Sequence, residues 1–160
     1  MKDKMTHSPH LLFADRARAN PEATLLIAPA SAGLPYAPQG FRHSYGEVFA
    51  EAGALSQKFA TAGYGLGSRV ALLLENRPEF FTFWLALNAI GASIVPINPD
   101  LRRDELVFQR DMAEAPLLIA IAERLADLAD IHPGKVTVIG ANDDIPPSPV
   151  RLTAEPGGPD

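Results

Sequence analysis

The stretch RVALLLENRPEFFTFWLALNAIGASIVPINPDLRRDEL, residues 69–106, decides the fold class. It begins with Arg69–Leu74, a continuous apolar run that is too short for most helices and is typical of a parallel strand covered on both faces. Asn76–Pro78 then open a helix, because proline suits the first helical turn, where its missing N–H is not needed. A second strand follows at Ala92–Ile97. The stretch therefore predicts a strand–helix–strand unit, from which parallel sheets are built.

The helix predicted at Glu79–Ile90 is apolar on nearly every side and is expected to be buried almost all round. Its aromatic residues could line an apolar substrate pocket, since such pockets are rich in aromatic side chains. Helical spacing in so apolar a helix favours the simpler interpretation, a place in the hydrophobic core. The residues concerned are Phe80, Phe81, Phe83 and Trp84.

Alternating helices and strands continue on both sides of this unit. Short connections between them favour a mostly parallel sheet flanked by helices, so the predicted fold class is α/β. The remaining predicted helices are His10–Ala19, one beginning at Ser44, Asp104–Ala113 and about Glu123–Asp130, and the remaining strands are Thr24–Ala28, Leu117–Ile121 and Val136–Ile139. Residues 1–139 form the predicted α/β domain, and the proline- and glycine-rich residues 140–160 are predicted to be a linker or arm.

Two local signals define the helix that begins at Ser44. Ser44 and Glu47 have the spacing of a capping box, in which each side chain accepts the other residue's backbone N–H. Gly63 is suited to a left-handed cap at the end of the same helix. The glycines of Gly63–Gly67 do not predict a phosphate-binding loop, because here a helix precedes them and a strand follows, the reverse of the order that such a loop needs.

Composition limits the classes of function. The chain has 160 residues, a net charge of −5 and a pI near 5.3, which argues against nonspecific nucleic-acid binding. It has no cysteine, which excludes disulfides, thiolate metal sites and a cysteine nucleophile, and its four histidines show no metal-ligand spacing. No apolar run reaches the roughly 18 residues of a membrane span, and no signal-peptide pattern opens the chain. We therefore expect a cytoplasmic protein.

Arg102 and Arg103 are the candidate binding residues. They follow the carboxyl end of a predicted parallel strand, the side on which open α/β sheets bind ligands, and arginine suits bidentate contact with phosphate. In the alternative interpretation, they form a solvated first helical turn with local ion pairs to Asp104 and Glu105. Asp100 counts against a phosphate site, because its carboxylate would repel the same anion.

The sequence FRHSYGEVFAEAGALSQKFATAGYGLGSRVALLLENRPEFFTFWLALNAIGASIVPINPDLRRDEL resembles the N-terminal region of AMP-forming acyl-CoA synthetases, members of the adenylate-forming superfamily. The resemblance covers Phe41–Ile121 well and the first forty residues more loosely. Among the branches of the family it is most similar to bacterial ligases for fatty, carnitine-type or similar acids. The residues that carry it are Gly63 and Gly67 before Arg69-Val70-Ala71, Asn76-x-Pro78-Glu79, Leu85-Ala86, Ile90-Gly91-Ala92, Val95-Pro96-x-Asn98-Pro99, and Leu101-Arg102 with Glu105-Leu106.

The resemblance implies an ATP-dependent carboxylate ligase. Such enzymes use ATP and magnesium to form an acyl-adenylate, and the thiol of coenzyme A then displaces AMP to give a thioester. In some relatives the loop after the Val-Pro-x-Asn-Pro strand approaches the coenzyme A nucleotide, which implies a cofactor-binding role for Arg102 and Arg103. The family's Ser/Thr/Gly-rich phosphate loop is absent from this sequence, so the resemblance implies an N-terminal fragment that is inactive alone and binds none of these cofactors tightly.

Two other functions remain open at this point. The chain could be a stand-alone binding or assembly module without catalysis, or part of an adenylation domain that uses another acceptor, such as a carrier protein. Family members pack this sheet against a second sheet from later sequence, so a fragment is expected to leave apolar surface uncovered and to form homo-oligomers.

Overall fold

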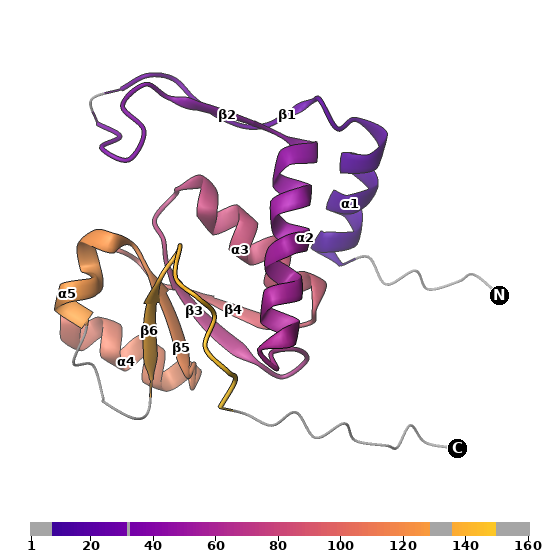
Figure 1. Cartoon of the computed structure of the whole chain (residues 1–160). Coiled ribbons are helices and arrows are strands. Elements are labelled where there is room, and N and C mark those ends of the chain that lie inside the picture. Colours follow the sequence, from indigo (N-terminus) through magenta and orange to yellow (C-terminus); the bar gives the residue numbers. More distant parts are fainter. Residues whose placement is uncertain (1–7, 32, 129–135, 150–160) are drawn as a thin grey trace, which may run out of the picture.

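The computed structural model describes residues 8–31, 33–128 and 136–149. Helices and strands alternate along most of this length (Figure 1). The elements are α1 (Pro9–Ala19), β1 (Thr24–Ala28), β2 (Phe41–Ser44), α2 (Tyr45–Thr61), β3 (Arg69–Leu73), α3 (Pro78–Ala89), β4 (Ser93–Pro96), α4 (Arg103–Ala113), β5 (Leu117–Ala120), the 3₁₀ turn η1 (Ala122–Arg124), α5 (Leu125–Leu128) and β6 (Thr137–Gly140).

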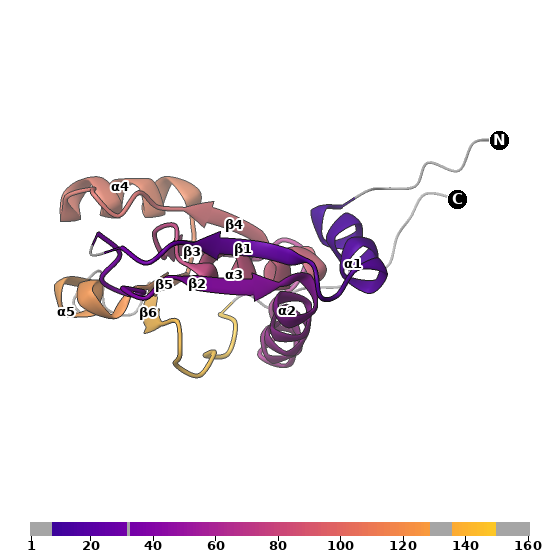
Figure 2. The same ribbon diagram turned by 90° about the horizontal axis from the view of Figure 1, so that it is seen from above.

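The predicted α/β class is confirmed. Four parallel strands form one sheet in the order β4-β3-β5-β6, with Ala71 of β3 opposite Val95 of β4 on one side and Leu118 of β5 on the other. Figures 1 and 2 show α2 and α3 on one side of this sheet and α4 on the other. Because all four strands run the same way, the corners that follow β3, β4 and β5 meet at the same edge, the carboxyl edge of the sheet.

Strand β1 lies where the sequence predicts it, but it does not join the parallel sheet. It pairs antiparallel with β2, and the two form a separate ribbon that projects from the body in Figure 1. The sequence analysis missed β2 as a strand, since Phe41–Ser44 is only four residues long and its last residue is also a helix cap. The ribbon is anchored at its base, where Tyr45 N–H and Gly46 N–H donate to the carbonyls of Ala23 and Pro21.

The predicted helix signals are confirmed in detail. Ser44 Oγ accepts the Glu47 N–H at 3.2 Å, and the Glu47 carboxylate accepts the Ser44 N–H at 2.7 Å. These hydrogen bonds, the one from the Ser44 backbone first, lower the pKa of Glu47. Gly63 has a φ of 89°, as a left-handed cap requires. Helix α3 exposes only Glu79 and Ala89, which agrees with its predicted burial.

Most of the core lies around the central strands. The side chains of β5 are all buried, and those of β3 are buried after Arg69. A smaller cluster around Val48, Ala52, Leu85 and Ala86 lies between α2 and α3, and Leu55 packs against both clusters. Among the residues that the structure describes, none belongs to a helix long and apolar enough to cross a bilayer.

The C-terminal part differs in one respect from the prediction. The helix expected at about Glu123–Asp130 begins with the 3₁₀ turn η1 and becomes α-helical only at Leu125, while Asp130 lies outside the described residues. Residues 141–149 contain no helix or strand. They nevertheless contact the body: Ile145 packs against the main core, and Ser148 N–H donates to the Ala62 carbonyl at 2.7 Å. The predicted arm continues through residues 150–160, outside the described part.

Candidate functional site

The carboxyl edge of the parallel sheet carries two clefts, and a third lies beside it under the β1–β2 ribbon. The cleft under the ribbon has a volume of about 600 Å³, and the two at the carboxyl edge have volumes of about 510 and 170 Å³. The two larger volumes are within the range of ordinary ligand pockets. The 510 Å³ cleft lies between the β3–α3 and β4–α4 corners, and its lining includes Glu75, Asn76, Asn98 and Asp100. The 170 Å³ cleft lies beside the ends of β5 and β6.

The structure places both predicted site residues at the start of α4 but gives them different partners. Arg103 Nη1 donates to the backbone carbonyl of Asp127 in α5 at 2.8 Å. The Arg102 guanidinium is exposed and makes no hydrogen bond or ion pair with any residue in the described ranges, whereas the Arg102 backbone N–H is capped by the Glu105 carboxylate at 3.0 Å. Arg102 is therefore the more available of the two cations for an external anion.

The corner before Arg102 is held by a residue that the sequence analysis did not single out. Arg124 in η1 donates through Nη1 to the Pro99 carbonyl and through Nη2 to the Leu101 carbonyl, the latter at 3.4 Å. Its Nε lies 3.4 Å from an Asp127 carboxylate oxygen, outside hydrogen-bond geometry. The guanidinium thus bridges the β5–α5 connection and the β4–α4 corner.

A second arginine, Arg77, joins the β3–α3 corner to the same 3₁₀ turn. Its side chain is only 16% exposed and forms ion pairs of 3.0 Å with Glu75 and with Glu123 of η1. Burial alone would lower the pKa of Arg77, but the hydrogen bonds to Glu123 and Glu75 outweigh it and raise that pKa. The Tyr36 ring, from the β1–β2 loop, lies 4.6 Å from the guanidinium carbon in a cation–π contact.

Glu75 has a left-handed backbone with a φ of 56°, which is uncommon outside glycine and asparagine. This conformation turns the chain sharply between β3 and α3. The pKa of Glu123 is lowered, first by its own backbone N–H and then by Arg77. Arg77 lies between two carboxylates, those of Glu75 and Glu123, each at 3.0 Å.

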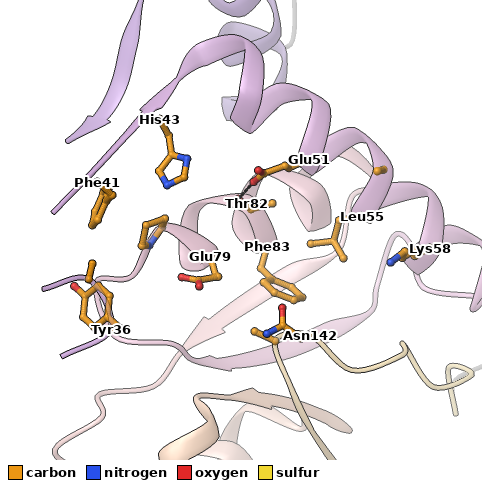
Figure 3. A pocket seen from close by; sticks show the side chains of 14 residues that line it. Tyr36, Phe41, His43, Glu51, Leu55, Lys58, Glu79, Thr82, Phe83 and Asn142 are labelled. Carbon is orange, nitrogen blue, oxygen red and sulfur yellow. Dashed lines mark hydrogen bonds between the residues drawn. The ribbon is translucent and has the colours of Figure 1, made fainter. Parts of the chain in front are cut away.

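The 600 Å³ cleft, shown in Figure 3, lies between the ribbon, α2 and α3. Tyr36, Phe41 and His43 line it from the ribbon side, and Glu79, Thr82 and Phe83 from α3. Thr82 Oγ1 donates to the Glu51 carboxylate at 3.5 Å across the cleft. Phe83 is 3% exposed and belongs to the main core as well, so the core interpretation of the α3 aromatic residues holds for it, although it also borders this cleft.

Clustered metal ligands are absent from the described residues. They contain no cluster of three or more His, Asp or Glu side chains that could hold an ion such as magnesium. Of the two described histidines, His43 lines the 600 Å³ cleft and is tilted against Phe41, and the His10 ring stacks on Phe49, with its buried Nδ1 unpaired among the described residues. The other two histidines, His7 and His132, lie outside the described residues.

Arg102 and Arg103 were predicted from the sequence, whereas the residues that support them were not. Arg124 carried the same signal as Arg102, a cation just after the carboxyl end of a parallel strand, and could have been found in that way. Arg77 and Glu123 are 46 residues apart, and no local pattern joins them. The position of Tyr36 depends on how a long loop returns to the body.

The sequence of this chain matches a known protein family and several curated proteins. The model of the family described as "AMP-binding enzyme" matches residues 13–157. Crotonobetaine/carnitine–CoA ligase of Escherichia coli is 36% identical over 112 residues, which are 70% of this chain but 21% of the relative. The chain therefore spans about a fifth of the length of the curated relatives it matches.

Solved structures agree with the sequence matches. The N-terminal domain of FACL13 from Mycobacterium tuberculosis superposes with a TM-score of 0.72 at 26% identity, covering 85% of this chain and 34% of that one. A fatty acyl CoA synthetase from the same organism gives a TM-score of 0.71 at 26% identity, covering 83% and 26%. The chain therefore corresponds to about a third of the first of these proteins and about a quarter of the second. The chain belongs to the AMP-binding enzyme family.

Proposed function

We propose that this chain is the N-terminal part of an ATP-dependent acyl-CoA ligase. The intact enzyme would join a carboxylate to ATP, giving an acyl-adenylate and pyrophosphate, and the coenzyme A thiol would then displace AMP to form a thioester. The observation that carries the proposal is the family match over residues 13–157 together with relatives that are CoA ligases. The names of the curated relatives support a carnitine-type acid as the substrate class, and the name of a structural neighbour, a fatty acyl CoA synthetase, supports a fatty acid.

The fragment itself is proposed to be inactive. Stabilisation of the charge that develops on the transferring phosphoryl group is the main task of such a site, and it needs cations and backbone N–H groups aimed at the phosphates. The described residues contain no cluster of three or more His, Asp or Glu side chains that could hold a metal ion, and nothing in the sequence matches the family's phosphate loop. No step of adenylation can therefore be assigned to residues of this chain.

The part that this chain contributes to ligand binding is proposed to be Arg102 and Arg103, as contacts to a phosphate of coenzyme A. Support comes from the exposed Arg102 guanidinium, which has no partner among the described residues, at the first turn of an 11-residue helix, whose N-terminal dipole end also favours an anion. Arg103 is turned toward the Asp127 carbonyl, so we assign it the weaker contact. Asp100 is exposed nearby and is expected to weaken the site rather than abolish it.

The test uses two proteins, this chain and the longer polypeptide that contains it. Carboxylate-dependent ATP–pyrophosphate exchange is expected from the longer protein and not from this chain. In the longer protein, Arg102→Gln should raise KM for coenzyme A about tenfold, the effect of one lost charge-assisted phosphate contact, and leave the exchange rate unchanged. Arg18→Gln, which neutralises an exposed arginine on α1, is the matched control.

Two outcomes would contradict the proposal. Exchange activity in this chain alone would show that the adenylation site lies within it. An unchanged KM for coenzyme A in Arg102→Gln and in Arg103→Gln would remove the assigned phosphate contact while leaving the ligase assignment intact.

Self-association of the fragment also remains a proposal. Phe108 and Met112, one turn apart on α4, are 66% and 70% exposed, and such an apolar pair favours contact with another surface. Light scattering over a wide range of protein concentration is expected to show a dimer or a larger species. A monomer at every concentration would contradict this expectation.

A further inference from the structure

The 3₁₀ turn η1 lies at the centre of the carboxyl edge. Two of its three residues are neighbours in sequence but point to different corners of the sheet: Glu123 pairs with Arg77 at the β3–α3 corner, and Arg124 donates to Pro99 and Leu101 at the β4–α4 corner. One short turn after β5 thus joins the corners of the two strands β3 and β4. The three contacts are Glu123–Arg77, Arg124–Pro99 and Arg124–Leu101, and each joins loops that are far apart in sequence.

The Arg124 contacts fall on the backbone just before Arg102. Pro99 and Leu101 are the carbonyl acceptors, and Asn98 closes the corner by accepting the Asp100 N–H through its side chain at 3.0 Å and the Leu101 N–H through its carbonyl at 3.3 Å. A guanidinium that binds two carbonyls of one corner fixes their relative direction, because its donors lie in one rigid plane. The direction of α4's first turn follows from that corner.

Arg124 is itself poorly placed to touch a ligand. Its side chain is 20% exposed, and both of its terminal nitrogens are engaged by the corner. The exposed cation is Arg102, three residues beyond Pro99. Arg124 therefore holds the corner, whereas the Arg102 side chain is exposed to solvent.

We propose that Arg124 is a positioning residue, which holds the Pro99–Leu101 corner so that Arg102 is presented to a phosphate, and that the Glu123–Arg77 pair anchors η1 while it does so. This inference rests on the proposed phosphate contact of Arg102 for its functional consequence. The positioning itself rests only on the geometry of this chain. A positioning role and a purely electrostatic role of Arg124 predict different results for Arg124→Lys. Lysine keeps the charge but lacks the planar fork that donates to two carbonyls.

Hydrogen exchange measured by NMR on this chain tests the positioning. The reporters are the N–H groups of Leu101, bound to the Asn98 carbonyl, and Leu106, bound to the Arg102 carbonyl at 3.0 Å, which lie on either side of Arg102. Arg124→Lys and Arg124→Gln are both expected to speed their exchange about tenfold, which corresponds to the loss of one hydrogen bond from a charged donor. Exchange of Ile119, in the middle of β5, reports global unfolding and can accelerate by up to the same factor, because the lost hydrogen bond also lowers global stability.

Arg69→Gln is the matched control at the opposite edge of the sheet. Arg69 also donates to a backbone carbonyl, that of Ala113 at 3.1 Å, and pairs with Glu114 at 2.9 Å. This variant should leave exchange at Leu101 and Leu106 unchanged. Wild-type exchange at Leu101 and Leu106 in Arg124→Lys would overturn the proposal, since only a charge effect would then remain.

A titration with adenosine 3′,5′-bisphosphate separates this inference from the proposed function. The amide shifts of Arg102 and Arg103 would be followed, and Arg124→Lys and Arg124→Gln should both weaken the apparent affinity by about threefold to tenfold. A wild-type affinity in Arg124→Lys, with exchange at Leu101 accelerated, would overturn the link between the corner and the anion. An absence of saturable shifts at Arg102 in the wild-type chain would count against the proposed phosphate contact, and the exchange result would still decide the positioning role.

Discussion

The tetrapeptide Leu-Leu-Ile-Ala occurs twice in this chain, once in β1 as Leu25–Ala28 and once in β5 as Leu117–Ala120. Both copies are strands. The β5 copy is buried at all four positions, whereas the β1 copy is half-buried at three positions and exposed at Ile27. Identical local sequence thus gives the same secondary structure and two different environments.

The number of neighbouring strands accounts for the difference. Strand β5 lies between β3 and β6, and helices cover the sheet on both faces. Strand β1 has only β2 beside it in a two-stranded ribbon, a form that is marginally stable unless it packs against something else. Leu25 and Leu26 do pack against the smaller core cluster, so the ribbon is anchored along part of its length.

The connections after the two copies also differ. After β5 the chain reaches the carboxyl edge at once, and η1 places Glu123 and Arg124 among the corners of neighbouring strands. After β1 the chain makes a long loop, and Tyr36 reaches Arg77 only because that loop folds back toward the body. Residues after a central parallel strand are therefore placed by the sheet, whereas the position of Tyr36 after β1 depends on the path of its loop.

Ile119→Ala is expected to have the largest effect on this comparison. Ile119 is 0% exposed, so truncation leaves a cavity between two neighbouring strands and should lower the free energy of unfolding by about 3 kcal/mol. Urea unfolding followed by the fluorescence of the single tryptophan, Trp84, measures it. A loss below about 1 kcal/mol would mean that β5 is less tightly packed than the structure shows.

Gly40→Ala is expected to come next, because it disturbs the return of the β1–β2 loop without changing either copy of the tetrapeptide. Gly40 has a φ of 74°, and a Cβ there would lie 2.5 Å from the Ala28 carbonyl oxygen, so backbone must move. We expect a loss of about 2 kcal/mol in the free energy of unfolding. Gly53→Ala in α2, where a Cβ meets nothing within 4 Å, should instead stabilise the chain by about 0.5 kcal/mol.

Ser44→Ala tests the end of β2 that leads into α2, and should cost about 1 kcal/mol at neutral pH through loss of the cap. The pKa of Glu47 is lowered in the folded chain, so its contribution is present above the ordinary glutamate pKa and is lost as pH falls through the lowered value. The difference between wild type and Ser44→Ala should therefore shrink below about pH 4. Ser56→Ala, within the same helix, should show no such pH dependence.

Ile27→Ala completes the comparison with the smallest expected effect. The side chain is 61% exposed, so the free energy of unfolding should change by no more than about 0.5 kcal/mol. The same substitution in the two copies of the tetrapeptide would then differ several-fold in cost. A loss at Ile27 close to that at Ile119 would show that another surface, such as a second copy of the chain, covers the ribbon in solution.

The features of the fold that could be predicted from the sequence are those with local signals. The apolar run of β3, the proline that opens α3 and the Ser44–Glu47 box are signals that act within a few residues, and each was confirmed. Strand β2 was missed because a four-residue strand that ends in a helix cap has no pattern of its own. The position of Arg102 and Arg103 at the start of a helix after β4 was also predictable, although their binding role stays a prediction.

The sequence by itself determined the α/β class, the order of most elements and the caps of the helix that begins at Tyr45, because periodicity and capping depend on neighbours along the chain. Only the tertiary structure decided which Leu-Leu-Ile-Ala copy is central, and that Arg77, Glu123 and Arg124 join separate corners at the carboxyl edge. Those contacts link residues 25 and 46 positions apart, and they form only after the strands have packed side by side.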